Sequence, residues 1–281
     1  MLAKLYLGDA RFHLKKFESA SFQTCITSPP YFGLRDYGER GQIGLEDSVD
    51  EYVQELVQVF REVRRTLTTD GTLWLNLGDC YNKKQLVGVP WKVAFALQED
   101  GWFLRSDIVW AKSNPMPENV KDRPTRSHEF LFLFSSSAKY FYDNEKIKEP
   151  AILDVGSTQI KFGGNKYNKE KEQIKGTKVF GSIYKQNGLK NKRDVWTIGS
   201  QSFKNAHFAV MPKLLVEPCI LAASKQGDTI LDPFAGSGTV GCVALNHNRN
   251  FVGIELNEEY LKIMHDRIYK EAPLINKIEI N

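Results

Sequence analysis

The sequence predicts an α/β fold: a doubly wound, mostly parallel sheet with helices on both faces. Short apolar runs alternate with helical patterns along most of the chain, an order that is typical of parallel sheets covered by helices. Near the C-terminal end a strand leads through a glycine-rich turn into a helix, as in nucleotide-binding α/β proteins. With 281 residues, 42% of them hydrophobic and 26% charged, the chain can form one large domain with a substantial core.

The first half of the chain contains five expected strands and two expected helices. Ser48, followed three residues later by Glu51, has the spacing of a capping box, and apolar residues then recur at helical spacing. Asp70-Gly71 is expected to stop this helix. In order, the pattern predicts strands at 4–8 and 22–27, the helix that follows Ser48, a strand at 72–77, a helix at 90–98, and strands at 103–110 and 128–134.

The last 70 residues return to a regular pattern after a long irregular segment. They predict helices at 212–224, 238–247 and 258–270, with strands at 229–232 and 251–255. In residues 155–205 the periodicity is lost, and eleven lysine and arginine residues stand against three acidic residues. Composition alone favours a solvated insertion there. The lysines and isolated aromatic residues also suit a segment that faces nucleic acid.

Several classes of protein are excluded by composition. The longest apolar runs, such as 130–134, are too short to span a bilayer, and the first residues lack the apolar core of a signal peptide. The four cysteines are widely spaced, which predicts neither a zinc site nor a disulfide framework. The five histidines form no ligand cluster, so no metal is expected. We therefore expect a protein of the reducing cytoplasm with no membrane partner.

A proline elbow interrupts the chain directly after the strand at 22–27. Proline lacks a backbone N–H and has a fixed φ, so a central strand cannot continue through Pro29-Pro30. The elbow offers the hydroxyl of Ser28, carbonyls that no strand ladder has to use, and the flat ring of Tyr31. These groups could hold a planar group that carries an amine, although a rigid turn would by itself explain the two prolines.

The glycine-rich turn suits a ligand that contains a nucleoside. Gly236, Gly238 and Gly241 fit the dinucleotide pattern G-x-G-x-x-G, and an acid at Glu255 ends the next strand, where it can accept ribose hydroxyls. Asp232, which precedes the first glycine, would suit a cationic amino-acid group better than a pyrophosphate. Because so little chain follows this unit, the rest of its sheet must come from earlier strands.

Together these motifs resemble those of the β-class DNA methyltransferases, which are specific for amino groups and use S-adenosylmethionine. The resemblance rests on TSPPY at 27–31 and DPFAGSGT at 232–239, in that order, and extends over most of the chain. It implies a Rossmann-like methyltransferase sheet that is circularly permuted. The implied units are a catalytic half at 1–150, a basic target-recognition region at 151–205, and a cofactor-binding half of the same domain at 206–281.

The resemblance also implies roles for individual residues. Ser28, Pro29, Pro30 and Tyr31 would form the catalytic elbow: Ser28 Oγ and the Pro29 carbonyl accept the amine hydrogens, and Tyr31 stacks on the base. Asp79 would either face the cofactor or be an ordinary turn aspartate. The residues implied in cofactor binding are Asp9, Asp79, His207, Asp232, Phe234, Gly236, Gly238, Thr239 and Glu255.

The implied substrate is double-stranded DNA, from which the target base must be flipped out of the stack. A cognate restriction endonuclease in the same bacterial, archaeal or phage-infected cell is a further possible partner. For each single lysine, a solvated side chain remains an alternative to a DNA contact. The candidate DNA-binding residues are Lys112, Arg123, Arg126, Lys161, Lys166, Lys190, Lys192 and Arg193.

Three alternatives remain open for the activity. Serine before Pro-Pro-Tyr favours methylation of cytosine N4, with adenine N6 as the second choice within the family. An RNA or protein-glutamine methyltransferase would have asparagine in place of Ser28 and an earlier glycine loop. A catalytically silent DNA-binding relative would not need both the elbow and the cofactor acids.

Overall fold

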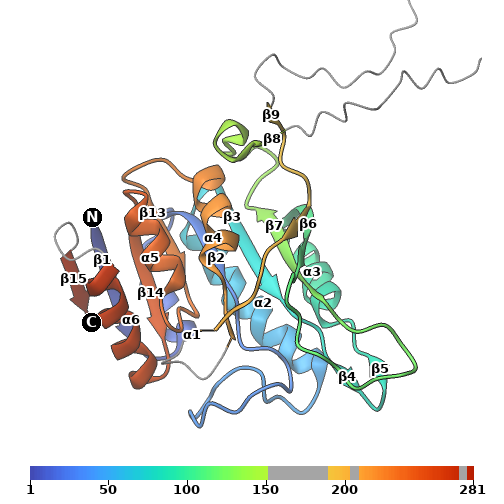
Figure 1. Cartoon of the computed structure of the whole chain (residues 1–281). Coiled ribbons are helices and arrows are strands. Elements are labelled where there is room, and N and C mark those ends of the chain that lie inside the picture. The colour runs from blue at the N-terminus through green and yellow to red at the C-terminus, as the bar shows by residue number, and fades with distance from the viewer. Residues whose placement is uncertain (151–188, 203–208, 272–276) are drawn as a thin grey trace, which may run out of the picture.

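A sheet of nine strands runs through the part of the chain that the computed structural model describes, which is residues 1–150, 189–202, 209–271 and 277–281 (Figure 1). The strands of this sheet are β1 (Leu2–Leu7), β2 (Phe22–Thr27), β3 (Leu67–Leu77), β6 (Phe103–Ala111), β7 (His128–Ser135), β10 (Val195–Thr197), β13 (Thr229–Asp232), β14 (Asn250–Glu255) and β15 (Lys277–Ile280). The helices are α1 (Ala10–Leu14), α2 (Val49–Thr66), α3 (Val89–Glu99), α4 (Lys213–Ala223), α5 (Thr239–Asn246), α6 (Glu258–Glu271) and the short 3₁₀ helix η1 (Asn144–Ile147).

The strand order is β10-β6-β7-β3-β2-β13-β14-β1-β15, and only β7 runs antiparallel to its neighbours. The N-terminal strand β2 pairs in parallel with the late strand β13, with Thr24 opposite Ile230 and Cys25 opposite Leu231. The two parts of the chain therefore form one sheet, as the sequence predicted, and the mostly parallel α/β fold is confirmed.

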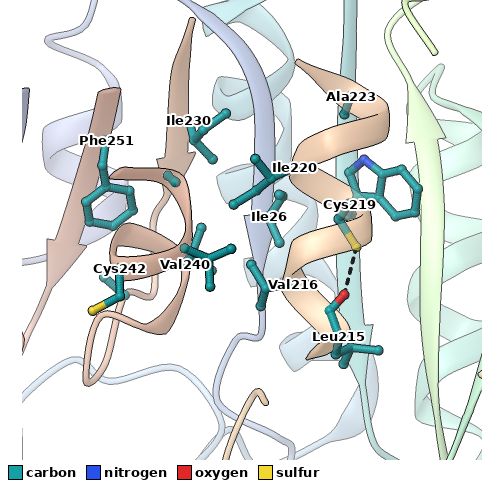
Figure 2. Packing of buried hydrophobic residues seen from close by; sticks show 14 of the residues in the cluster. Ile26, Leu215, Val216, Cys219, Ile220, Ala223, Ile230, Val240, Cys242 and Phe251 are labelled. Atoms are coloured by element: carbon teal, nitrogen blue, oxygen red, sulfur yellow. Dashed lines mark hydrogen bonds between the residues drawn. The ribbon is translucent and has the colours of Figure 1, made fainter. Parts of the chain in front are cut away.

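Helices cover both faces because neighbouring residues on each strand point to opposite sides. Ile26 and Ile230 contribute to the cluster that α4, α5 and α6 cover, whereas the adjacent Cys25 and Leu231 contribute to the cluster under α1, α2 and α3. Figure 2 shows the first of these clusters: Val216 and Ile220 of α4 lie over Ile26, with Val240 of α5 beside them. Strands buried on both faces explain the nearly continuous apolar runs in the sequence.

Helix α2 begins as predicted but ends earlier than predicted. The Ser48 hydroxyl accepts the Glu51 N–H at 3.2 Å, and the Glu51 carboxylate accepts the Ser48 N–H at 3.2 Å, so the capping box is present. The helix ends at Thr66, and β3 starts at once with Leu67 opposite Phe22. The predicted stop at Asp70-Gly71 was wrong because these residues lie in an irregular part of β3, where the pairing register with β2 shifts.

Three smaller sheets were not predicted, nor were the two outermost strands, β10 and β15. The first small sheet is the hairpin of β4 (Tyr81–Asn82) and β5 (Gln85–Leu86), which follows β3 directly. The others pair β8 (Glu149–Pro150) with β9 (Leu189–Lys190) and β11 (Gln201–Ser202) with β12 (Ala209–Val210). All these strands have only two to four residues, which is too short for a clear sequence pattern. Within the described residues, no helix is long and apolar enough to cross a membrane.

Truncation of a buried ring in α2 is expected to destabilise the fold. Phe60 is 0% exposed in the cluster under α2, so Phe60→Ala should lower the free energy of unfolding by about 3–5 kcal/mol. Phe95 of α3 is 55% exposed, and Phe95→Ala should change it by less than about 1 kcal/mol. Urea unfolding of both variants measures the difference, and equal losses would contradict the packing described here.

Candidate active site

The proline elbow and the glycine-rich turn meet at one edge of the sheet. β2 ends at Thr27 and β13 ends at Asp232, and because the two strands are parallel neighbours their carboxyl ends lie side by side. The Thr27 hydroxyl donates a hydrogen bond of 2.7 Å to Asp232 Oδ1 across 205 residues of sequence. This edge is where strands distant in sequence become neighbours, the usual position of ligand sites in open α/β sheets.

A cavity of about 400 Å³ opens at this edge, a size that suits a small molecule. Its walls come from both parts of the chain and include Trp110, Asn76 and Glu129 in addition to residues that the sequence singled out. The predicted site residues that line it are Asp9, Ser28, Pro29, Pro30, Tyr31, Lys112, Asp232, Phe234, Gly236, Thr239 and Glu255.

The glycine-rich turn uses its glycines for two different purposes. Gly236 has a φ of +52° and lines the cavity, where its N–H donates a 2.7 Å hydrogen bond to Glu255 Oε2. Gly238 has a φ of +76° and does not line the cavity, and a Cβ there would lie 2.5 Å from Met264 Cγ. The absence of a side chain at Gly238 thus lets α5 start close to α6, while its predicted contact with the cofactor stays a prediction.

Two carboxylates, the buried Asp232 and the partly buried Glu255, face the cavity from neighbouring strand ends. Burial raises the pKa of Asp232 to about 7, although hydrogen bonds from Thr27 and the Phe234 N–H act in the opposite direction. Burial also raises the pKa of Glu255, which accepts N–H bonds from Gly236 and Asn257. A ligand with positive charge would favour the ionised form of both acids, so this pair fits a cationic ligand.

Asp9 lines the same cavity from the end of β1. Its carboxylate accepts the Arg11 N–H at 2.8 Å, which caps α1, and forms an ion pair of 2.6 Å with the Arg11 guanidinium. Burial would raise the pKa of Asp9, but the hydrogen bonds and charge of Arg11 outweigh it, so the pKa lies below its ordinary value. Asp9 is therefore an ionised acceptor at the cavity wall.

On the other side of the elbow, a polar cluster surrounds Tyr31. The Tyr31 hydroxyl donates to Glu129 Oε2 at 2.7 Å, with Asn76 Oδ1 as a second acceptor at 3.2 Å. Ser28 Oγ donates to the Tyr31 oxygen at 3.3 Å. Glu129 also forms an ion pair with Lys112. Lys112 lies in the cavity wall, where it balances the charge of Glu129, and its contact with the DNA strand stays a prediction.

The comparisons with known proteins agree with this geometry. Residues 22–266 match the family model of N6/N4 DNA methylases, which is most of the chain. The chain belongs to this family of DNA methylases. It is thus a site-specific DNA methyltransferase that acts on amino groups, and the resemblance found in the sequence is confirmed.

Curated relatives of this methylase match over nearly their whole length. It is 44% identical to the type II methyltransferase M.Cfr9I of Citrobacter freundii, an alignment that covers 98% of this chain and 91% of the relative. It is also 44% identical to M.SmaI of Serratia marcescens, covering 95% and 91% of the two chains.

Solved structures share the fold of the methylase. The PvuII DNA methyltransferase, described as cytosine-N4-specific, has a TM-score of 0.70 at 19% identity and covers 99% of this chain and 94% of its own. A DNA modification methylase of Thermus thermophilus, TTHA0409, solved with S-adenosyl-L-methionine, has a TM-score of 0.67 at 23% identity and covers 99% of both chains. At these identities the likeness extends to the fold alone.

Asp79 of the methylase is not among the residues that line the cavity, and its contact with the cofactor stays a prediction. Its Oδ1 accepts three backbone N–H groups, those of Cys80, Gly88 and Val89, each at 2.9 Å. The carboxylate thus closes the turn around the β4–β5 hairpin and satisfies the first N–H groups of α3. The alternative of an ordinary turn aspartate is the one that the geometry favours.

The remaining predicted DNA-binding residues of the described chain lie near acids or aromatic rings of the protein itself. Arg123 pairs with Glu118 at 2.7 Å, and Arg126 lies 3.9 Å from Asp79. Nearer the β8–β9 pair, Lys190 and Arg193 share Glu149 at 3.4 and 2.7 Å, and Lys192 lies 4.7 Å from the Trp196 ring centroid. Lys161, Lys166 and His207 lie outside the described residues, so their assignments stay predictions.

Two features of possible functional relevance were not predicted from the sequence: the polar residues Glu129 and Asn76, and the tip of the β4–β5 hairpin. Glu129 and Asn76 each lie in an apolar strand, and a single polar residue in such a strand was the only signal available. The second feature is the exposed tip of the β4–β5 hairpin, where Lys83 and Lys84 have φ values of +47° and +68°. Left-handed backbone is unfavourable for lysine, and strain of this kind clusters at functional sites.

Loss of the Thr27 hydroxyl is expected to have an effect that depends on pH. The folded-state pKa of Asp232, about 7, lies above its ordinary 3.8, so its contribution to stability is fully present below pH 3.8 and is lost as the pH rises through about 7. Because the ionised carboxylate needs the donor most, Thr27→Val should cost about 1–3 kcal/mol at pH 8 and less at pH 5.

Urea unfolding at the two pH values measures this cost. Thr24→Val is the matched control, since this equally buried hydroxyl bonds only the neutral Thr72, at 3.0 Å to its carbonyl and 2.8 Å to its hydroxyl. Thr24→Val should lower the free energy of unfolding by the same amount at pH 5 and at pH 8. If Thr27→Val also cost the same at both, its hydroxyl would not be supporting an ionised Asp232.

Proposed function

We propose that this methylase transfers a methyl group from S-adenosylmethionine to the N4 amine of cytosine in double-stranded DNA. The observation that carries the proposal is the serine elbow, Ser28-Pro29-Pro30-Tyr31, which lines one cavity together with the glycine-rich turn. Serine at the first position of this elbow favours cytosine within the family to which the chain belongs. Adenine N6 is the other amine that this family methylates.

The residues present fit the proposed cofactor. S-adenosylmethionine carries positive charge on its ammonium and sulfonium groups, and the buried acids Asp232 and Glu255 offer negative charge in the same cavity. Asp232, Phe234, Gly236 and Thr239 would hold the methionine end, Glu255 the ribose, and Asp9 the adenine. Once bound, the cofactor supplies an electrophilic methyl group.

The elbow would orient the amine of the target base. The nitrogen lone pair of cytosine N4 is delocalised into the ring, so the amine is a poor nucleophile until its hydrogens are held. Ser28 Oγ and the Pro29 carbonyl are the proposed acceptors, and both residues line the cavity. Fixing the base in this way lowers the barrier through orientation, without a covalent bond to the enzyme.

The Tyr31 ring is held in place before any base arrives. A Cβ on Gly78 would lie 2.5 Å from Tyr31 Cε2, so the absence of a side chain at Gly78 makes room for the ring. The hydroxyl is anchored to Glu129 at 2.7 Å. A ring so constrained offers a fixed wall against which a flipped base could stack.

For its partners we propose double-stranded DNA and a restriction endonuclease of the same sequence specificity. The relatives named above are type II methyltransferases. The term type II refers to restriction-modification systems, in which a methyltransferase is accompanied by an endonuclease, and this supports the proposed partner. Lys83 and Lys84 at the hairpin tip join the surface cations that could contact phosphates. The basic region 151–205, most of which lies outside the described residues, remains the proposed target-recognition region.

The methylated base tests the central proposal. DNA modified by the purified protein with S-adenosylmethionine is digested to nucleosides, which are separated and identified by mass. N4-methylcytosine is the expected product. Methyladenine alone would replace cytosine by adenine as the substrate, and unmodified DNA would contradict both assignments.

Removal of the elbow hydroxyl should separate catalysis from cofactor binding. Ser28→Ala deletes one acceptor of the amine but leaves Asp232 and Glu255 in place, so turnover should fall by about 100-fold while the dissociation constant of the cofactor stays within about twofold. Single-turnover rates and calorimetric titration give the two values. Ser21→Ala, at an exposed serine bonded to the Glu18 carbonyl, is the control. A parallel loss of rate and affinity would indicate that Ser28 only supports the fold of the pocket.

A further inference from the structure

A chain of hydrogen bonds leads from the catalytic elbow to a carboxylate. Ser28 Oγ donates to the Tyr31 oxygen at 3.3 Å, and the Tyr31 hydroxyl donates to Glu129 Oε2 at 2.7 Å. All three residues line the cavity. The first bond is long for two hydroxyls, as is common for catalytic hydrogen bonds before substrate binds. Both donors point in the same direction, toward Glu129.

Glu129 is held in place from three sides. Its carboxylate accepts from Tyr31 and, at 3.2 Å, from the Asn76 amide, and it pairs with the Lys112 ammonium. The Glu129 side chain is 14% exposed, and it projects from the second residue of β7. The carboxylate is therefore fixed in one position, with its oxygens directed at three donors.

Methyl transfer to an amine creates a proton that must leave. The attacking nitrogen is neutral and keeps both hydrogens when it gains the methyl group, so the product carries a positive charge until one hydrogen is released. A neutral serine hydroxyl can pass a proton on but is too weak a base to retain it. The acids that the cofactor half contributes to the cavity bond elsewhere: Asp232 accepts from Thr27 and the Phe234 N–H, and Glu255 accepts from the Gly236 and Asn257 N–H groups.

We propose that Glu129 is the terminal proton acceptor of the methyl transfer and receives the proton through Ser28 and Tyr31. The amine proton passes to Ser28 Oγ, the Ser28 proton to the Tyr31 oxygen, and the Tyr31 proton to Glu129 Oε2. The N–CH₃ bond forms as the sulfonium–CH₃ bond breaks, and the cationic sulfonium and anionic carboxylate become a neutral thioether and a neutral acid. This inference rests on the proposed transfer to an exocyclic amine.

The surroundings of Tyr31 and Glu129 suit these roles. Burial, and then the charge of Glu129, raise the pKa of Tyr31 well above its ordinary value, so this residue stays a neutral hydroxyl that can accept one proton while it donates another. Lys112 forms an ion pair with Glu129 and balances the charge of its carboxylate. Glu129 acts through Tyr31 and is therefore a positioning residue that does not touch the base.

Glu129→Gln, Tyr31→Phe and two double variants separate proton acceptance from structural support. Glu129→Gln keeps an oxygen that accepts from Tyr31 but cannot take up the proton. Lys112→Met with Glu129→Gln removes both charges and so leaves no unpaired cation. Tyr31→Phe leaves the ion pair intact but interrupts the relay. Glu62→Gln is the control. Like Glu129, Glu62 forms an ion pair, with Arg65 at 2.8 Å, but it lies on α2 outside the cavity.

The expected results concern the rate of a single turnover at saturating cofactor and DNA. Glu129→Gln should lower this rate by about 100-fold, the lower range for general base catalysis, with dissociation constants of cofactor and DNA within about twofold of the parent protein. The charge-free double variant should stay equally slow. Tyr31→Phe combined with Glu129→Gln should be no slower than the slower single variant, because both interrupt one relay.

Two outcomes would overturn the inference. A Glu129→Gln rate within threefold of the parent, or recovery of the rate in the charge-free double variant, would leave Glu129 as half of a structural ion pair. Should Glu129→Gln fail to fold, the rates of the double variant and of Tyr31→Phe still decide. The methylated base is identified first, with the parent protein. If that base is adenine, the proposed substrate is refuted, and the same variants then test the relay with the adenine amine as substrate.

Discussion

The pairing of β2 with β13, closed by the hydrogen bond from Thr27 to Asp232, is the contact on which the site depends. It joins strands that are 205 residues apart, and it sets the proline elbow beside the glycine-rich turn. Each segment alone has half of a site. Together they enclose one cavity, because parallel neighbours present their carboxyl ends at the same edge of the sheet.

Burial has different consequences for the acids around this cavity. Asp232 and Glu255 have neutral donors around them, and their raised pKa values suit a pocket that awaits a cationic ligand. Asp9 and Glu129 have their own cations, Arg11 and Lys112. The first pair suits binding of the cofactor. Glu129, whose charge is balanced by Lys112, suits the proposed role of proton acceptor.

Sequence patterns predicted the elbow and the strand-end acids Asp232 and Glu255 because local rules apply to them. Two prolines must end a strand, and an acid at a strand end must lie at the sheet edge, whatever the rest of the chain does. Asp79 shows where such reasoning stops: it also follows a strand, yet its carboxylate binds three backbone N–H groups of its own turn. Lys112 is a second example: a lysine is usually found at the surface, but here its side chain lies in the cavity wall beside Glu129.

The sequence by itself determined the alternation of strands and helices, the elbow, the glycine-rich turn and the family, since each depends on residues that are close together in the chain. Only the tertiary structure decided which side chains share the cavity. Glu129 lies 98 residues from Tyr31 and Asn76 lies 45 residues from it, and no local pattern relates them. They meet because β3 and β7 are paired in the sheet and the elbow crosses their ends, which is a consequence of strand order and not of any motif.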